Sequence, residues 1–297
     1  MTSTVSPRIT ILVDNRAAAG LTTEHGFSLW VEVGNRHILF DTGQKSGLLV
    51  ENASLLGIDL AETDSIVLSH GHYDHSGGLS QILRLAPQAE IYLHPAAVAP
   101  RCSIVAGVPK SIKMPTISQM ALNRVPMEKL HWLQREDHLG PGIGVTGPIP
   151  RLSSFEENGS SFFLDCVGLR PDPIDDDLAL WMETTQGLIV IVGCAHAGLI
   201  NTINYVSRLT GDRRIRAIIG GFHLQSAGPQ RLRQTVAALQ AYNPELIVPC
   251  HCTGEAAVAI LQDTFGERVC PGMAGMICRI DHQSQLTISH RSAMTAA

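Results

Sequence analysis

The sequence predicts a protein of the α/β class. Short apolar runs typical of buried strands alternate along the chain with segments whose apolar residues have helical spacing. The chain has 297 residues, of which 44% are hydrophobic and 16% are charged, so one large fold can bury a sizeable core. Polar residues directly follow several of the apolar runs, which is typical of strands that end at a functional site. We therefore expect a single domain over residues 1–297.

Strands and helices alternate in the first third of the chain. Gly34 and Asn35 are turn residues between two apolar runs and predict a β-hairpin. Leucines at helical spacing precede Gly57, and a second leucine-rich segment ends before Pro87, so both segments are expected to be helices. The expected strands are residues 9–13, 27–33, 37–40, 65–68 and 91–93, and the expected helices are residues 45–56 and 79–85.

The alternation weakens in the middle of the chain and then returns. Proline and glycine are frequent between about residues 96 and 165, and we expect this segment to form a cap with some strands of its own, of the kind that often covers a site. The strands expected after the cap are residues 178–183, 188–192, 215–219, 246–248 and 275–280, and the helices are residues 199–209, 229–242 and 255–265.

Composition and charge argue against several classes of function. The formal charge of −5 disfavours nucleic acid as a partner. The most apolar run, residues 187–193, is far shorter than the roughly 20 residues of a membrane-spanning helix, and the N-terminal MTSTVSPRIT lacks the features of a secretory signal. Seven cysteines in a chain of this length are expected to be free thiols in a reducing cytoplasm. No interface can be recognised, so a homodimer stays open.

Four potential metal ligands lie within six residues, directly after the strand expected at residues 65–68. In the string HGHYDH they are His70, His72, Asp74 and His75. Burying four such polar groups together is costly unless they bind something. Glycines in and after the string allow the loop to curl, so that the side chains can surround one or two ions. The sequence therefore predicts a metal site at this strand end.

This string resembles the His-x-His-x-Asp-His signature of the metallo-β-lactamase superfamily, and LFDTG at residues 39–43 is similar to a second motif of that family. The resemblance implies an αββα sandwich with the metal site at one edge of two sheets. It also implies that His70 and His72 bind one metal ion, and that Asp74 and His75 bind the other. Asp41, in the second motif, stands at a strand end where it can orient a metal-binding histidine by a hydrogen bond.

Later histidines complete the site that this resemblance implies. His196 and His251 each follow an apolar strand, and we expect the first to complete the His70–His72 site and the second to join Asp74 and His75. The alternative for each is a core histidine that bonds to the backbone. The surrounding strings GCAHAG, GGFH and PCHCTG, with TEHG near the N-terminus, resemble a branch whose members are described as metal-dependent hydrolases or dihydropterin ribofuranosylaminobenzene phosphate synthases.

The chain departs from most dinuclear members of the superfamily at the bridging ligand. Those members carry an aspartate in a strand–Gly–Asp motif, and here the corresponding residue is Cys194; their Pro-Gly-His motif is also missing. Either Cys194 replaces the bridging aspartate, or the position is vacant and Cys194 is a buried core thiol. Cys250 and Cys252 flank His251, and metal binding and core packing are again the two alternatives.

A few polar residues are candidates for contact with the substrate. Glu24 and His25, in TEHG, are expected at the rim of the site. His223 follows the apolar strand expected at residues 215–219 and is expected to contact substrate or to support a ligand. The acidic run at residues 175–177 is either a solvated turn or a source of one more carboxylate for the site.

The predicted chemistry is hydrolysis of a small molecule. A histidine-rich set with a thiolate favours zinc, one or two ions per chain, with manganese or iron left open. Zinc lowers the pKa of bound water to about 7, and the resulting metal-bound hydroxide can attack an ester, a lactone or a phosphoester. In this prediction Asp74 is both ligand and proton acceptor, and His223 or His25 stabilises the developing oxyanion.

Two other functions stay open at this stage. One is a non-hydrolytic synthase or lyase acting on a phosphorylated pterin-like metabolite. The cap would then supply aromatic and phosphate contacts, for which the candidates are Arg101, Lys110, Lys113, Trp132 and Arg151. The other is a metal-poor binding protein on the same fold.

Overall fold

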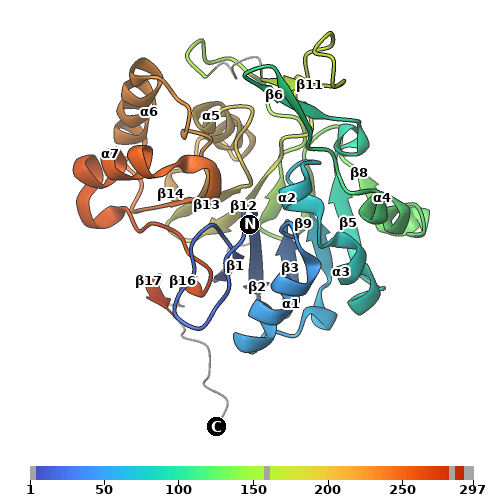
Figure 1. The fold of residues 1–297 in the computed structure, drawn as a ribbon. Helices are drawn as coiled ribbons and strands as arrows, with labels where there is room; N and C mark the ends of the chain where they lie inside the picture. Colours follow the sequence, from blue (N-terminus) through green and yellow to red (C-terminus); the bar gives the residue numbers. More distant parts are fainter. Residues whose placement is uncertain (1–4, 157–160, 281–284, 291–297) are drawn as a thin grey trace.

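The computed structural model describes residues 5–156, 161–280 and 285–290 (Figure 1). Its strands form one eight-stranded sheet, one six-stranded sheet and a small three-stranded sheet. The two large sheets share an apolar core to which both contribute, with Leu29 and Val31 from one and Leu180 and Ile189 from the other. The α/β class and the sandwich of two sheets are therefore confirmed.

The eight-stranded sheet combines antiparallel and parallel pairing. In spatial order its strands are β17 (Leu286–His290), β16 (Met276–Ile280), β1 (Arg8–Val13), β2 (Ser28–Val33), β3 (Arg36–Phe40), β4 (Ser65–Val67), β5 (Glu90–Leu93) and β8 (Leu130–Trp132). Neighbours from β17 to β3 pair antiparallel, and neighbours from β3 to β8 pair in parallel. The carboxyl ends of β3 and β4 therefore lie side by side at one edge.

The six-stranded sheet brings a second set of strand ends to that edge. Its strands in order are β15 (Leu246–Cys250), β14 (Ile215–Gly221), β13 (Gly187–Val192), β12 (Ala179–Thr184), β10 (Ile143–Val145) and β9 (Asp137–Gly140). Because β13, β14 and β15 pair in parallel, their carboxyl ends are also adjacent.

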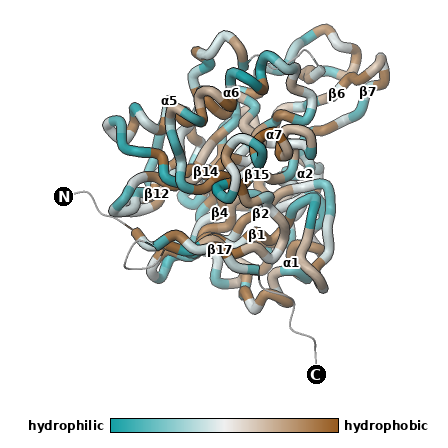
Figure 2. The backbone as a smooth tube through the Cα atoms, turned by 90° about the vertical axis from the view of Figure 1, so that its left-hand side faces the viewer, coloured by the Kyte–Doolittle hydropathy of each residue, from teal (hydrophilic) through white to brown (hydrophobic). Residues whose placement is uncertain are grey.

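Helices cover the outer faces of both large sheets. On the eight-stranded sheet these are α1 (Ser46–Leu55), α3 (Leu79–Leu85) and α4 (Thr116–Leu122). On the six-stranded sheet they are α5 (Leu199–Leu209), α6 (Pro229–Tyr242) and α7 (Glu255–Phe265). Figure 2 shows hydrophobic stretches along the strands in the middle of the molecule, as expected for sheets buried on both faces.

Short helical segments join these layers. They are α2 (Tyr73–Ser76) and the 3₁₀ helices η1 (Leu60–Glu62), η2 (Pro95–Val98), η3 (Met127–Lys129), η4 (His251–Thr253) and η5 (Gly266–Arg268). Within the described ranges, no helix has both the length and the apolar character needed to cross a membrane.

The segment expected to be a cap, residues 96–165, is divided among three sheets. β6 (Cys102–Val105), β7 (Val108–Ser111) and β11 (Phe162–Phe163) form the separate small sheet, which lies at the top of Figure 1. β8, β9 and β10 instead extend the two large sheets. Residues 157–160 of this segment lie outside the described part of the chain.

A disulfide corrects the expectation that all seven cysteines are free. Cys102 is bonded to Cys166, which is 64 residues further along the chain, and their Cα atoms lie 5.2 Å apart. Pairing of β6 with β11 brings the two segments together, with Cys102 opposite Phe163. The sequence could not show this bond, because it depends on strand pairing between distant segments. The other five cysteines are free thiols.

The long elements confirm the expected pattern, and the short ones account for the differences. The helices expected at residues 79–85, 199–209, 229–242 and 255–265 have these bounds in the structure. The sequence missed α2, which consists of four mostly polar residues, and β17, whose residues are largely exposed. α2 lacks the apolar periodicity on which the expectations were based, and in β17 the alternation is limited to Leu286 and Ile288.

Candidate metal centre

The predicted site residues converge at the shared edge of the two large sheets. In chain order they are Asp41 after β3, His70 and His72 after β4, Asp74 and His75 on α2, Cys194 and His196 after β13, His223 after β14, and His251 after β15. All of them except His223 are buried. The convergence follows from the parallel pairing, because carboxyl ends of parallel strands meet at one edge of a sheet.

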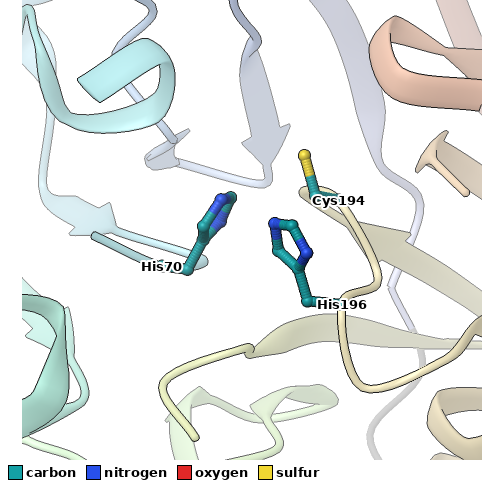
Figure 3. Close-up of side chains that lie close together, drawn as sticks. All are labelled: His70, Cys194 and His196. Atoms are coloured by element: carbon teal, nitrogen blue, oxygen red, sulfur yellow. The ribbon is translucent and has the colours of Figure 1, made fainter. Parts of the chain in front are cut away.

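One group of imidazoles is formed by His70, His72 and His196. His70 Nε2 lies 3.0 Å from His72 Nδ1, and the rings of His70 and His196 are 4.7 Å apart at their centroids. Figure 3 shows His70 and His196 facing each other with Cys194 beside them. Burial and the nearby Arg101 lower the pKa of His72 to about 3, and burial holds the pKa values of the other two well below the usual range. All three rings are therefore neutral, the form that binds metal.

A second group surrounds the carboxylate of Asp74. Its Oδ2 lies 3.3 Å from His251 Nε2 and 3.2 Å from His25 Nε2, and His75 Nε2 lies 3.3 Å from His251 Nε2. Burial alone would raise the pKa of Asp74, but hydrogen bonds from His25 and His251 hold it well below its usual value. Asn15 orients His251, because its Oδ1 lies 3.0 Å from His251 Nδ1. The carboxylate is therefore ionised and surrounded by imidazole nitrogens.

Cys194 lies between these two groups. Its thiol, with the ring nitrogens of His70 and His196, forms one set of atoms that all lie within 4.8 Å of one another. The same thiol forms a second such set with His75 and His251, and it lies 3.1 Å from His75 Nε2. Cys194 thus occupies a position shared by both groups.

Asp41 holds the histidines of both groups through one buried carboxylate. It accepts hydrogen bonds from the backbone N–H and the hydroxyl of Ser69, both at 2.7 Å, and Ser69 Oγ lies 2.8 Å from His70 Nδ1. Its Oδ2 also lies 2.7 Å from His75 Nδ1. Burial alone would lower the pKa of His75, but Asp41 raises it to about 9. The carboxylate therefore directs the Nε2 atom of His75 towards the centre.

The backbone around the centre adopts conformations that non-glycine residues rarely occupy. Asp41, Ala195, His223 and His251 have φ values of 59°, 49°, 48° and 46°. Gly193 allows the two sheets to approach, because a Cβ there would lie 2.0 Å from Ser69 Oγ. Left-handed residues of this kind turn the chain sharply at the strand ends, so that adjacent side chains point into the same space.

The three candidates for substrate contact lie in different places. His25 is on the rim, with its side chain 54% exposed beside Asp74. Glu24 lies outside the groups and accepts hydrogen bonds from the backbone N–H groups of Gln44 and Lys45, so it braces a loop. The ring of His223 lies 4.4 Å from that of His196, next to the first group.

The candidate phosphate ligands of the cap are mostly engaged elsewhere. The buried Arg101 is ion-paired with Asp172 and Asp176, and Arg151 donates a 2.7 Å hydrogen bond to the carbonyl of His196. Trp132 is partly exposed on β8, the edge strand of the eight-stranded sheet. Lys113 forms a β-bridge with His72, and Lys110 donates to the hydroxyl of Tyr73 at 2.9 Å.

Phe162 on β11 is a site residue that the sequence did not indicate. Its ring lies 5.6 Å from that of His72, 5.4 Å from that of His196 and 5.9 Å from that of His223. The small sheet thus reaches the centre through an aromatic side chain. An isolated Phe-Phe pair in an irregular segment carries no signal that could have identified it.

The acidic run at residues 175–177, just before β12, is not a solvated turn. Two of its carboxylates bind the loops that carry histidines of the centre. Asp176 and Asp177 are buried, whereas Asp175 is exposed. Asp176 accepts a 2.7 Å hydrogen bond from the backbone N–H of Gly71, and Asp177 accepts one of the same length from Ala197. The two carboxylates therefore position the loops that carry the histidines of the first group.

Asp177 is expected to make stability depend on pH. Burial raises its pKa from 3.8 to about 7, so the folded state holds this proton more tightly than the unfolded chain, and stability falls as pH rises from about 4 to about 7. Asp177→Asn removes this titration and keeps an acceptor for Ala197. Relative to the parent, the metal-stripped variant should gain a few kcal/mol between pH 4 and pH 8, since one pKa unit is about 1.4 kcal/mol.

Urea unfolding at several pH values measures this difference. Asp175→Asn is the control, because it changes an exposed carboxylate in the same turn. A constant difference between Asp177→Asn and the parent across this pH range would contradict the prediction.

The chain belongs to the metallo-beta-lactamase superfamily. The model of that family matches residues 21–251, more than half of the chain, and includes every residue of the two groups described above. The αββα sandwich and the strand-end position of the site agree with this assignment. The chain is therefore a member of a superfamily of metal-dependent proteins.

Its relatives include both a named synthase and a named hydrolase. It is 30% identical over 264 residues to the 7,8-dihydropterin-6-methyl-4-(beta-D-ribofuranosyl)-aminobenzene-5'-phosphate synthase of Methanocaldococcus jannaschii, covering 82% of this chain and 86% of that protein. Tm1679, a solved structure described as a metal-dependent hydrolase of the beta-lactamase superfamily, is 31% identical, with a TM-score of 0.76 over 91% of this chain and 98% of that one. The metallo-beta-lactamase fold protein YhfI from Bacillus subtilis shares the fold at 11% identity, with a TM-score of 0.55 over 92% of this chain and 99% of that one.

Proposed function

We propose that the protein is a metal-dependent hydrolase of small-molecule esters, lactones or phosphoesters, with two metal positions that share Cys194. His70, His72 and His196 would hold one ion, and Asp74, His75 and His251 would hold the other. The observation that carries this proposal is the arrangement of two donor groups around a common thiol. Imidazole and thiolate donors favour zinc over magnesium or manganese.

The donor atoms fit such an ion. His72 Nε2 is buried and has no hydrogen-bond partner within the described ranges, which is costly for a polar atom unless it has a ligand. The second nitrogens of His70 and His75 are bonded to Ser69 and Asp41, which leaves their Nε2 atoms directed into the site. Support of this kind is typical of histidines that bind metal.

The ions would supply Lewis acidity towards the bond that is hydrolysed. The protein's own residues perform the other tasks. Asp74 is ionised and its Oδ2 is bonded to His25, so it can serve as a ligand and orient the His25 ring at the rim of the site; its lowered pKa makes it a weak base and disfavours the role of proton acceptor expected from the sequence. His25 and His223 flank the centre and can donate hydrogen bonds to a developing oxyanion. Phe162 lies against the rings of His72 and His196 and places an apolar face on that side of the centre.

A non-hydrolytic synthase is the second candidate function. It is supported by the 30% identity to the dihydropterin ribofuranosylaminobenzene phosphate synthase, which extends over most of both chains. Phe162 offers an aromatic face that could stack on a flat ring such as a pterin. The same metal positions would serve both reactions, so the two functions are distinguished by substrate.

Metal analysis combined with His70→Ala tests the proposed function. Protein purified without chelator should contain about two zinc ions per chain, and His70→Ala should lose the ion at the first position together with activity. Plasma mass spectrometry gives the metal content, and a panel of lactones, phosphodiesters and phosphorylated pterins, with and without a second substrate, gives the reaction.

The control for this variant is His138→Ala, because His138 lies on β9, away from the two groups. Unchanged metal content and activity in His70→Ala would refute the metal assignment. Turnover that requires a second substrate and no water would instead support the synthase.

A further inference from the structure

A third set of donor atoms lies at the ends of three adjacent parallel strands. Cys194 follows β13, His223 follows β14, and Cys252 lies two residues after the end of β15. Their sulfur and ring nitrogen atoms all lie within 4.8 Å of one another. Both thiols are buried. His223 and Cys252 belong to neither of the two positions proposed above, so this set is a separate feature of the site.

The close approach of these side chains depends on a glycine. Gly221 lies at the end of β14, and a Cβ there would be 2.7 Å from Cys252 Sγ and 2.5 Å from the carbonyl of Gly193. Any side chain at this position would therefore displace Cys252 from Cys194. The backbone of His223 itself is left-handed, with φ of 48°, which turns its ring towards the two sulfurs.

One ring nitrogen of His223 is buried without a hydrogen-bond partner in the described part of the chain. His223 Nδ1 has no hydrogen-bond partner within the described ranges, although it is shielded from solvent. Cys252 Sγ lies 3.7 Å from the carbonyl of Cys194, a weak contact for a thiol. Two buried sulfurs that contact each other and a half-buried imidazole, with one ring nitrogen left without a hydrogen-bond partner among the described residues, form a donor set that suits a soft cation.

We propose that Cys194, His223 and Cys252 form a third site, which takes up a thiophilic metal ion such as Cd²⁺, or Zn²⁺ added in excess, beyond the two ions proposed above. The donor set of two thiolates and one imidazole binds zinc in proteins and leaves one coordination position open. Hard ions such as Mg²⁺ are excluded by the sulfur donors. Because Cys194 is shared with the two proposed positions, an ion bound here lies beside them at the same strand ends.

Cadmium titration of the metal-stripped, reduced protein tests this site. Binding of Cd²⁺ to thiolate produces ultraviolet charge-transfer absorption, which reports sulfur ligation independently of enzymatic activity. We expect Cys252→Ser to weaken this absorption and to bind one Cd²⁺ fewer per chain than the parent, and His223→Ala to lose the same ion. Cys250→Ser is the matched control, because the Cys250 thiol is also buried but bonds to the carbonyl of Val248.

The unsubstituted protein provides a second readout. Bound Cd²⁺ should protect Cys252 from alkylation, as measured by mass spectrometry of the peptides, and leave Cys250 as reactive as in the metal-free protein. Parent-like absorption and stoichiometry in a folded Cys252→Ser variant would overturn the third site alone. So would a disulfide between Cys194 and Cys252 in the protein as isolated. Loss of metal in His70→Ala with retained protection of Cys252 would show that the two proposals are independent.

Discussion

Cys194→Ala is expected to lose metal from both proposed positions and to reduce turnover by about 100-fold or more. The thiol is common to the two donor groups, so its removal leaves the first with three imidazoles and the second with two imidazoles and one carboxylate. Lewis-acid stabilisation by a metal ion is worth several kcal/mol, and 1.4 kcal/mol corresponds to a factor of ten in rate. Metal analysis and steady-state kinetics measure the two effects.

A second substitution at this position tests whether the site needs a thiolate or only an anionic ligand. Cys194→Asp replaces the thiolate by the carboxylate that most dinuclear members of the superfamily carry. We expect it to retain two ions and to bind Mn²⁺ better, relative to Zn²⁺, than the parent does. Cys278→Ser, a buried thiol on β16, is the control. Full metal content and turnover in Cys194→Ala would show that Cys194 is a core thiol.

Asp176→Ala is expected to destabilise the protein by about 3–5 kcal/mol. Arg101 is buried and its guanidinium is paired with Asp176, with one contact of 2.8 Å to Oδ2, and with Asp172 at 2.9 Å. Removing Asp176 leaves a buried cation with one partner and also removes the acceptor of the Gly71 N–H. Chemical denaturation of the metal-stripped protein gives the change in the free energy of unfolding.

The control for this prediction is an ion pair that is open to solvent. Arg8 and Glu32 form such a pair at 2.7 Å, with about a quarter of each side chain exposed, so Arg8→Ala should cost less than about 1 kcal/mol. Equal losses in the two variants would contradict the interpretation of Asp176 as the partner of a buried charge. Loss of metal affinity in Asp176→Ala would follow, because Gly71 lies between two of the proposed ligands.

Much of the site could be predicted because its signals are local. His70, His72, Asp74 and His75 lie within one short string, and the later histidines follow apolar runs that end where strands end. The helices with leucine or alanine periodicity were predicted for the same reason. In each case the pattern and the structure it specifies occupy the same stretch of chain.

The features that the sequence could not show depend on distant segments. The joining of β8, β9 and β10 to the large sheets follows from pairings across many residues, as does the Cys102–Cys166 bond. Asn15 reaches the centre from a loop and Phe162 from the two-residue strand β11, and neither segment has a distinctive composition. The position of Cys194 between two groups is likewise a property of the assembled edge. The sequence left open whether Cys194 replaces the bridging aspartate or is a core thiol, and only the assembled strand ends show which side chains it lies between.

The left-handed residues at the centre have a consequence for protein engineering. Asp41, Ala195, His223 and His251 each hold a backbone conformation that costs on the order of 1–3 kcal/mol, and the packed sheets must offset that sum. Glycine at Ala195 would relieve such strain without removing a proposed ligand. Selection for thermostability alone would therefore favour substitutions at these left-handed residues, which bring the side chains of the proposed metal centre together. Stability and activity are opposed in this part of the molecule, and variants evolved for heat resistance should be screened for metal content as well.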